Sequence, residues 1–319
     1  MSVFKRPRSA RSIVSVASMV LMATLTAFPA TGGEGNGRLS LRACGGAGLL
    51  GWGDVKFLKD SHNQQILYAA SKWGMETAGS CANPPIGWQA EVELRYDLNR
   101  RFGLGIACGR NRRTGETAMT ADLPPFLTSL HTWGQSTVLT TAVLNAYWNL
   151  PLDARSTAYV SAGAGFGSAV WNCKIRDEET IDIASWEQIK GTARDQGLLV
   201  QAGVGYEFRV AKRLILFVEA RGQILSLNDW QGEFINSTDA TQSAPLVNAS
   251  SALPKKIWLG EIAASGGRPV QAVLVASTFS PDPELYDGVR AFRLNFSGAV
   301  FQVGFRLELG ARPWSSDTR

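Results

Sequence analysis

The sequence predicts an all-β protein, an eight-stranded antiparallel up-and-down transmembrane β-barrel with long outer loops. Eight segments alternate apolar residues with polar or small ones, which is the period-two pattern of strands with two unlike faces. Their connections alternate between short and long, as in barrels with tight turns at one end and long loops at the other. An N-terminal stretch with the features of a secretion signal precedes all eight segments.

Residues 1–30 are predicted to be a secretory signal peptide. Four basic residues precede an apolar stretch at 13–28, and small residues follow at 29–33, with cleavage expected near Ala30. Residues 31–319 then form one barrel domain. The chain has 32 basic and 27 acidic residues, and the signal holds four of the basic ones and no acid, so the mature chain is nearly neutral. Its charge therefore indicates no nucleic-acid partner.

The predicted strands follow in chain order. They lie at 38–50, 88–98, 102–109, 134–149, 159–167, 198–209, 216–223 and 290–309. In the second, Trp88, Val92 and Leu94 share one face, whereas Glu91 and Glu93 lie on the other. The polar faces are rich in glycine, serine and charge, which suits a narrow lumen, and the apolar faces suit contact with lipid. Segments near ten residues long match a tilted membrane strand.

The last predicted strand contains an apparent change of face. Phe292, Leu294 and Phe296 set one parity, whereas the apolar residues from 301 onward set the other. The change falls at Ser297 and Gly298, where the pattern predicts a β-bulge.

The connections predict the orientation of the barrel. Tight turns at 99–101, 151–155 and 211–213 are expected to face the periplasm, together with both mature termini. Loops at 51–86, 110–132, 172–196 and 228–289 are expected to face outward.

Two of these loops show structure of their own. The first suggests a short amphipathic helix within 54–74. The last suggests a hairpin outside the membrane, formed by 257–259 and 270–275. The alternative places these two segments in the wall, giving ten strands.

Ten charged residues fall on the predicted inward face. They are Arg42, Glu91, Glu93, Arg95, Glu207, Arg209, Glu219, Arg221, Arg306 and Glu308. Unlike charges in a confined lumen must pair, because an unpaired buried charge is strongly disfavoured. An eight-stranded barrel is only wide enough for its own side chains, so we expect an ion-pair plug. The alternative is a gate in a narrow conductance path.

Aromatic residues fall near the strand ends, where girdles at the two membrane interfaces are expected. Those beside the long loops are Trp52, Trp88, Trp133, Trp171 and Trp230, and those beside the short turns are Trp148, Tyr206 and Phe208.

The cysteines and histidines indicate little chemistry. Cys81 and Cys173 lie in predicted outer loops, where an oxidising exterior permits a disulfide. The cysteine spacings match no metal or haem motif, so no metal and no cofactor are expected.

Both histidines, His62 and His131, also fall in predicted outer loops, with Ser61 and Ser136 as nominal partners. Nothing in the spacing requires a catalytic pair, and we predict no enzyme and no catalytic residue.

Three segments carry a resemblance to a known group. They are the glycine-rich run at 159–167, the hairpin at 96–105 and the closing stretch at 296–307. With them the mature chain resembles the small outer-membrane β-barrels related to the transmembrane domain of outer-membrane protein A and the opacity-type proteins. The resemblance extends over nearly all of the mature chain as a pattern. Such families usually end on an aromatic residue that the assembly machinery reads, whereas a polar tail follows here. Either Phe305 or Leu309 serves in that role, or the tail is tolerated.

The resemblance implies a location in the bacterial outer membrane but selects no single activity. Such families include anchors, adhesins, narrow channels and lipid-modifying enzymes. We expect a monomer with a structural or surface-interaction role, in contact with outer-membrane lipid, lipopolysaccharide and the barrel assembly machinery. The second hypothesis is a narrow channel or carrier for small solutes, gated by the lumenal charges. The third is a lipid-modifying enzyme. The sequence identifies no extracellular partner.

Overall fold

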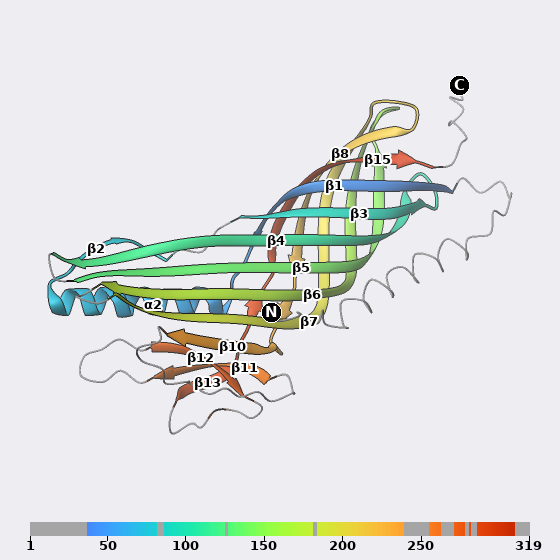
Figure 1. Cartoon of the computed structure of the whole chain (residues 1–319). Helices are drawn as coiled ribbons and strands as arrows, with labels where there is room; N and C mark the ends of the chain where they lie inside the picture. Colours follow the sequence, from blue (N-terminus) through green and yellow to red (C-terminus); the bar gives the residue numbers. More distant parts are fainter. Residues whose placement is uncertain are drawn as a thin grey trace, which may run out of the picture.

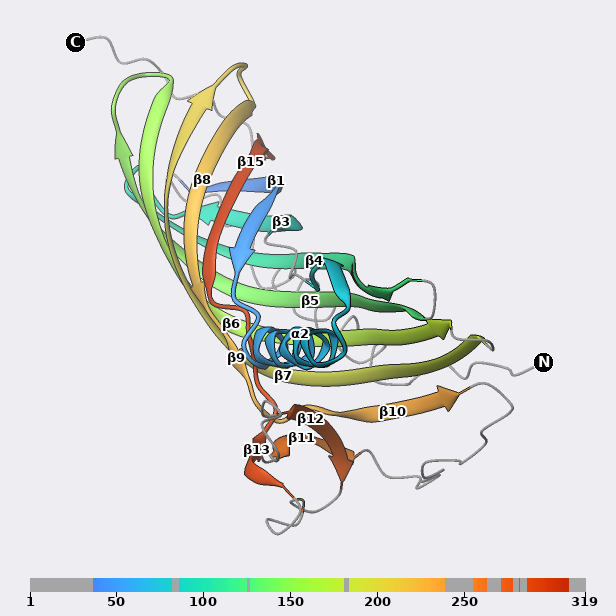
Figure 2. The same cartoon turned by 90° about the vertical axis from the view of Figure 1, so that its left-hand side faces the viewer.

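The protein is almost entirely antiparallel β-structure with one α-helix among the described residues. A computed structural model describes residues 37–81, 86–124, 127–180, 184–238, 255–262, 271–277, 281 and 286–309. The expected signal peptide at 1–30 lies outside them. Fifteen strands are formed within the described residues, which is more than the eight predicted. Figures 1 and 2 show that the long strands curve from a ring at one end into an open sheet at the other.

Eight of the strands pair edge to edge in a closed ring. They are β1 (Arg38–Leu50), β3 (Gly87–Asp97), β4 (Phe102–Leu123), β5 (Leu127–Pro151), β6 (Ser156–Thr180), β7 (Ala184–Arg209), β8 (Leu214–Ile224) and β15 (Gly298–Glu308). Neighbours from β3 to β8 pair antiparallel in chain order, β15 pairs β8, and β1 closes the ring between β15 and β3. Closure removes the open edges that a sheet otherwise presents along this stretch.

The three tight turns lie at one end of the ring, together with the beginning of β1 and the end of β15. The turns at 98–101, 152–155 and 210–213 join β3 to β4, β5 to β6 and β7 to β8. The Leu309 N–H donates to the Leu39 carbonyl, so the beginning of β1 and the end of β15 lie side by side there. This end is at the upper right of Figure 1.

Two of the expected outer loops, 110–132 and 172–196, are strand at 110–123, 127–132, 172–180 and 184–196. The pairing of β4 with β5 runs on to Leu123 opposite Leu127, and that of β6 with β7 runs on to Thr180 opposite Ala184. We call these extensions the blade: residues 113–123, 127–137, 171–180 and 184–193. The outer face of the blade carries polar residues, so apolar and polar residues alternate less clearly there than in the ring.

The helix α2 (Asp54–Trp73) lies in the concave side of the blade (Figure 2). Its buried residues include Val55, Leu58, Ile66 and Ala70, which belong to the main hydrophobic core. Gly74 ends the helix in the left-handed conformation, φ +67°, which glycine adopts without a steric penalty. The short helix expected within 54–74 is therefore present. Within the described residues, no helix has both the length and the apolar character needed to span a bilayer.

The remaining strands extend the sheet or cap it. The strand β2 (Glu76–Gly79) pairs with the end of β4, and β9 (Ser226–Leu227) pairs with β14 (Leu294–Asn295). The strand β10 (Gln231–Thr238) pairs with β7 along the blade.

The segments expected as a hairpin within 228–289 pair antiparallel, as β11 (Lys255–Ile262) and β12 (Gln271–Ser277). The strand β13 (Asp287–Ala291) pairs with β11 on its other edge. Neither β11 nor β12 lies in the ring, so the ten-stranded alternative for the ring is wrong.

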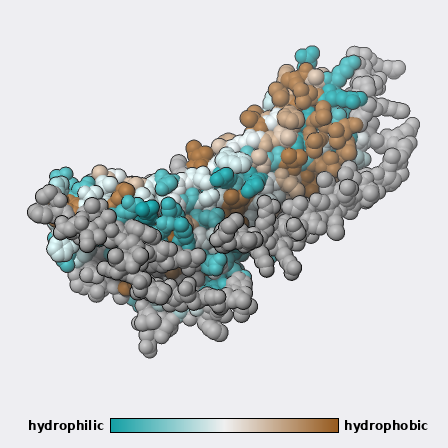
Figure 3. All heavy atoms as spheres, in the orientation of Figure 1, coloured by the Kyte–Doolittle hydropathy of each residue, from teal (hydrophilic) through white to brown (hydrophobic). Residues whose placement is uncertain are grey.

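The side chains that face inward change from charged to apolar along the molecule. Within the ring, Glu93 and Arg95 are buried on the inner face, whereas Val92 and Leu104 are exposed on the outer face. In the blade, by contrast, apolar side chains such as Trp133 are buried on the inner face. Figure 3 shows the matching outer surface, with apolar residues gathered over the ring end and polar residues more frequent over the blade end.

This change of the inner face from charged to apolar explains the apparent change of parity in the last predicted strand without a β-bulge. Leu294 pairs with Leu227, the Phe296 N–H donates to the Leu225 carbonyl, and Gly298 pairs with Gln223, so the register is unbroken. The predicted bulge at Ser297 and Gly298 is therefore wrong. Even-numbered residues face inward throughout, and only their chemistry changes, from Phe292, Leu294 and Phe296 in the apolar core to Gln302 and Arg306 in the charged part.

A glycine inside the ring is expected to be essential for its packing. A Cβ atom on Gly205 would lie 2.2 Å from Cζ of Tyr159, a fully buried ring bonded to Arg42 and Glu219. We expect Gly205→Ala to lower the free energy of unfolding in detergent by about 1–3 kcal/mol, the usual cost of overpacking. Gly222→Ala is the control, because its nearest neighbour would be 3.9 Å away. Equal urea midpoints for the two variants would contradict this prediction.

Candidate functional site

The ten charged side chains expected inside the barrel all lie on the inner face of the ring, with Arg209 half-buried at its rim. Ion pairs among them also include Arg38 and Asp97, which sequence reasoning missed. Counted over the described ion pairs, six arginines face six carboxylates. The arginines are Arg38, Arg42, Arg95, Arg209, Arg221 and Arg306, and the carboxylates are Glu91, Glu93, Asp97, Glu207, Glu219 and Glu308.

Arg42 on β1 is the centre of this network. Its guanidinium donates to Glu93 at 2.8 Å and to Glu219 at 3.2 Å. It also donates to the hydroxyl oxygens of Tyr147 at 2.6 Å and Tyr159 at 2.8 Å. The ring of Phe217 lies 4.0 Å from its carbon Cζ, at cation–π distance. One side chain thus contacts four other strands, β3, β5, β6 and β8.

Two further clusters lie along the lumen. Arg221 binds Glu91 through two contacts of 2.8 and 3.0 Å and Glu219 at 3.2 Å. This two-point geometry is the strong form of an arginine–carboxylate pair.

Nearer the tight turns, Arg95 donates to Glu207 at 3.1 Å and Asp97 at 2.9 Å, and Arg306 contacts the same two carboxylates. Buried charges are tolerated only when paired in this way.

Uncharged side chains complete the network, and sequence reasoning did not assign them to it. They are Asn145, Tyr147, Asn149, Tyr159, Ser161 and Gln201. All lie on the polar faces of their strands, so parity alone was the signal that could have found them.

The eight aromatic residues expected in the two girdles divide into two groups. Trp88, Trp148, Tyr206 and Phe208 are exposed on the outer face of the ring. By contrast, Trp52, Trp133, Trp171 and Trp230 are buried in the apolar core beneath the blade, so their placement in a girdle is wrong. The physical reason is the extension of β4–β7, which turns the expected rim into the interior of a second packed region.

The two cysteines for which the sequence permits a disulfide, Cys81 and Cys173, are both free. Cys81 follows β2 and Cys173 lies within β6, opposite Gln135 and Gly191. Each is buried in the apolar core, and the disulfide considered between them is wrong. Cys173 occupies a strand position rather than a loop that is free to approach Cys81.

A cluster of polar side chains lies on the inner face of the blade. His131 on β5 lies directly opposite Asp177 on β6, with Nδ1 2.8 Å from Oδ1. Its Nε2 atom lies 2.7 Å from Oγ of Ser129, two residues earlier on the same face. His62 of α2 lies against both, with its ring centroid 5.8 Å from that of His131 and its Nε2 atom 3.8 Å from Oδ1 of Asp177. Burial lowers the pKa of His62.

The serines considered as partners of these histidines lie elsewhere. Ser61 of α2 accepts a hydrogen bond at its Oγ from the Ala272 N–H, 2.8 Å away. Ser136 faces the opposite side of the sheet from His131. The contacts of Ser129, His131 and Asp177 match those of a nucleophile, a base and an orienting acid. Ser129 is only 4 % exposed, however, which limits the approach of a substrate.

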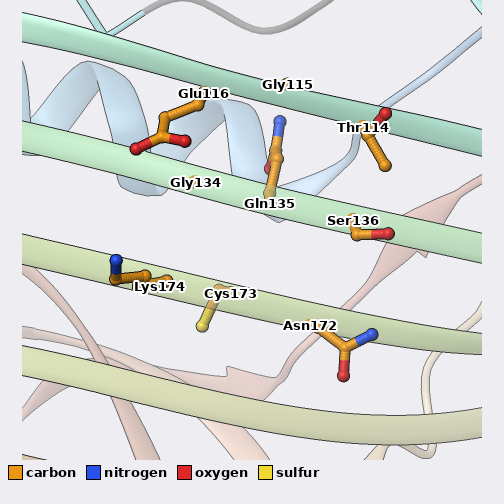
Figure 4. Close-up of a pocket in the computed structure, with 9 residues that line it drawn as sticks. All are labelled: Thr114, Gly115, Glu116, Gly134, Gln135, Ser136, Asn172, Cys173 and Lys174. Atoms are coloured by element: carbon orange, nitrogen blue, oxygen red, sulfur yellow. The ribbon is translucent and has the colours of Figure 1, made fainter.

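The outer face of the blade carries a shallow depression (Figure 4). It is lined by Thr114, Gly115, Glu116, Gly134, Gln135, Ser136, Asn172, Cys173 and Lys174. Figure 4 shows α2 running behind the strands that carry these residues. Most of the side chains are small or polar, and Glu116 and Lys174 are exposed, so this face of the blade suits water.

Comparison with known proteins gives no family for this chain. No protein-family model matches it, and no curated protein matches it in sequence. A structure of CarO from Acinetobacter baumannii is similar at 14% identity and a TM-score of 0.29, covering 73% of this chain and 95% of that one. The outer-membrane protease OmpT from Escherichia coli is similar at 7% identity and a TM-score of 0.25, covering 89% and 100%. Similarities this low support no conclusion about this chain.

Removing the central charge should destabilise the ring. Arg42→Met leaves Glu93 and Glu219 buried without their shared partner, and we expect the free energy of unfolding to fall by about 3–5 kcal/mol. Arg209→Met at the half-exposed rim should cost clearly less. Both are measured by urea titration of the refolded protein in detergent, with tryptophan fluorescence as the signal. Equal losses for the two variants would show that Arg42 has no central role.

Proposed function

We propose that this chain is a bacterial outer-membrane β-barrel protein with a structural or surface-interaction role. The observation that carries the proposal is the polarity of the closed ring, with exposed apolar side chains outside and paired charges inside. In β7 the outward residues from 198 to 208 are apolar, and Gln196 and Arg194 then follow on the same face. A run of this length matches the nine to eleven residues, roughly, of a tilted membrane strand.

The position of the tight turns supports an orientation. In outer-membrane barrels the short turns face the periplasm and the longer connections face outward. The mature termini would then be periplasmic, and α2, the blade and β10–β13 would stand on the cell surface. The polar outer face of the blade favours this placement, because it would be poorly solvated in lipid.

The surroundings we propose are lipid and lipopolysaccharide. Arg110 and Arg112 are exposed on the outer face of β4 where the apolar band ends. Guanidinium groups at that level are well placed to bind lipopolysaccharide phosphates in two-point contacts. The closed ring needs no second chain to cover an edge, which favours a monomer, inserted by the barrel assembly machinery.

A structural role is favoured over the channel hypothesis by the contents of the ring. Each of the six arginines lies against a carboxylate, and Tyr147 and Tyr159 extend across the same space. Moving an ion through would require several of these buried pairs to separate. We also propose that the protein is not a lipid-modifying enzyme, because Ser129 is buried on the inner face of the blade, away from the outer surface of the ring.

The filled lumen leads to a conductance prediction. We expect the refolded protein to show no discrete openings in planar bilayers at neutral pH, because the paired side chains occupy the path. Glu219→Gln and Arg221→Ala are the test variants, since each removes one side of a buried pair. Regular openings of the unaltered protein that these variants abolish would favour the gated channel.

The outer apolar surface leads to a second prediction. Val92, Leu144, Phe166 and Leu198 are each more than half exposed, so the mature chain should aggregate in buffer and become monodisperse in detergent. Replacing all four with serine should weaken partition into lipid vesicles. A monodisperse chain in detergent-free buffer would refute the membrane proposal. Circular dichroism should show predominantly β-structure in detergent.

A further inference from the structure

Both histidines of the chain lie in one cluster, although they are far apart in the sequence. The sequence contains two histidines, one on α2 and one on β5. Asp177 of β6 lies between them, 2.8 Å from His131 Nδ1 and 3.8 Å from His62 Nε2. The three candidate ligand atoms all lie within 4.8 Å of one another. Imidazole nitrogen and carboxylate oxygen are the donors that Zn²⁺ takes in proteins.

His62 provides an independent observation. Its Nε2 atom is buried and has no hydrogen-bond partner. The 3.8 Å to Asp177 is too long for a hydrogen bond. Buried polar atoms in folded proteins almost always have a partner, and a bound ion is one way to supply the partner that His62 lacks.

The distances suit a shared ion. Zn²⁺ binds nitrogen at about 2.0–2.1 Å and carboxylate oxygen at about 2.0–2.2 Å, which places two ligand atoms roughly 3–4 Å apart. The separation between His62 and Asp177 already lies in that range. The shorter separation between His131 and Asp177 must widen slightly, because the ion replaces the proton that joins them.

Ser129 holds the second nitrogen of His131. Its Oγ lies 2.7 Å from Nε2, so Nδ1 is turned toward Asp177 and His62. A partner on the free nitrogen of a ligating histidine orients the ring and strengthens metal binding. On the other side, the ring of Trp133 packs 5.7 Å from that of His62. The ligands therefore sit on hydrogen-bonded strands and a packed helix, as a preorganised site requires.

The local electrostatics permit a cation. The side chains of His62, His131 and Asp177 are 21%, 14% and 33% exposed, so an ion from solvent can reach them. Lys59, one helical turn before His62, places its Nζ atom over the ring of Trp133, 5.5 Å from the centroid. Asp177 supplies the negative charge.

We propose that His62, His131 and Asp177 form a binding site for one divalent transition-metal ion of the Zn²⁺ type. Two nitrogens and one oxygen favour Zn²⁺, Ni²⁺ or Cu²⁺ over Mg²⁺ and Ca²⁺, which prefer all-oxygen sites. The ion joins α2 to β5 and β6 and leaves a fourth position for water or an external ligand. The site does not depend on the membrane location proposed above.

Metal titration of the refolded full-length mature protein tests this site. With ZnCl₂ at pH 7.5 in a calorimeter, we expect one ion per chain, and MgCl₂ should give no heat. His62→Ala, His131→Ala and Asp177→Asn should each weaken Zn²⁺ binding at least tenfold. Asp60→Asn is the matched control, because Asp60 lies exposed on the same helix two residues from His62. Unchanged binding in His62→Ala, or no saturable binding in the unaltered protein, would overturn the proposal.

A measurement on the unaltered protein avoids variants that fail to fold. X-ray absorption of the zinc-loaded chain should show two imidazole ligands with nitrogen at about 2.0–2.1 Å. A spectrum without imidazole scattering would overturn the proposal. So would covalent labelling of Ser129 by a fluorophosphonate, because that result assigns His131 to a nucleophile relay.

Discussion

The paired charges around Arg42 are the interaction on which the rest of the ring depends. A guanidinium that is almost completely buried is tolerated because Glu93 of β3 and Glu219 of β8 both pair with it. Those pairs need a closed wall to exclude water, and the wall needs a polar filling because its apolar side chains point outward. Tyr147 and Tyr159 accept hydrogen bonds from the two terminal nitrogens of Arg42 and also pack edge to face with each other. Closure and charge pairing therefore support one another.

The same strands serve a second, opposite environment beyond the ring. In β5, Asn145 faces a charged lumen, whereas Trp133, on the same face further along, lies in an apolar core. The outer face changes in the other direction, from Leu144 to polar residues such as Ser136. One continuous strand thus has its apolar side chains on the outer face in the ring and on the inner face in the blade. The helix α2 packs against the concave side of the blade, beyond the last lumenal charges. This change accounts for strands twice as long as a bilayer needs.

The alternation along the sequence predicted which residues share a face of a strand, but not which of the two faces is apolar at each point along that strand. Inside the ring the prediction located the charged face correctly, because Glu91, Glu93 and Arg95 alternate with apolar neighbours without interruption. At 110–132 and 172–196 both faces contain polar residues, so the period is weak and the sequence predicts loops there. The tryptophans show the consequence: Trp88 lies outside the ring as expected, whereas Trp171 stacks on Phe292 in the core, with ring centroids 4.9 Å apart.

The histidine cluster depends on that same missed assignment. The sequence contains no spacing that links positions 62, 131 and 177, because the register of β5 with β6 and the docking of α2 bring them together. Part of the histidine cluster could nevertheless be predicted from the sequence. Once 127–133 is assigned as a strand, Ser129 and His131 share a face, and Ser136 must point to the other side. Strand parity would then have selected Ser129 as the partner of His131, whereas the approach of His62 required the folded chain.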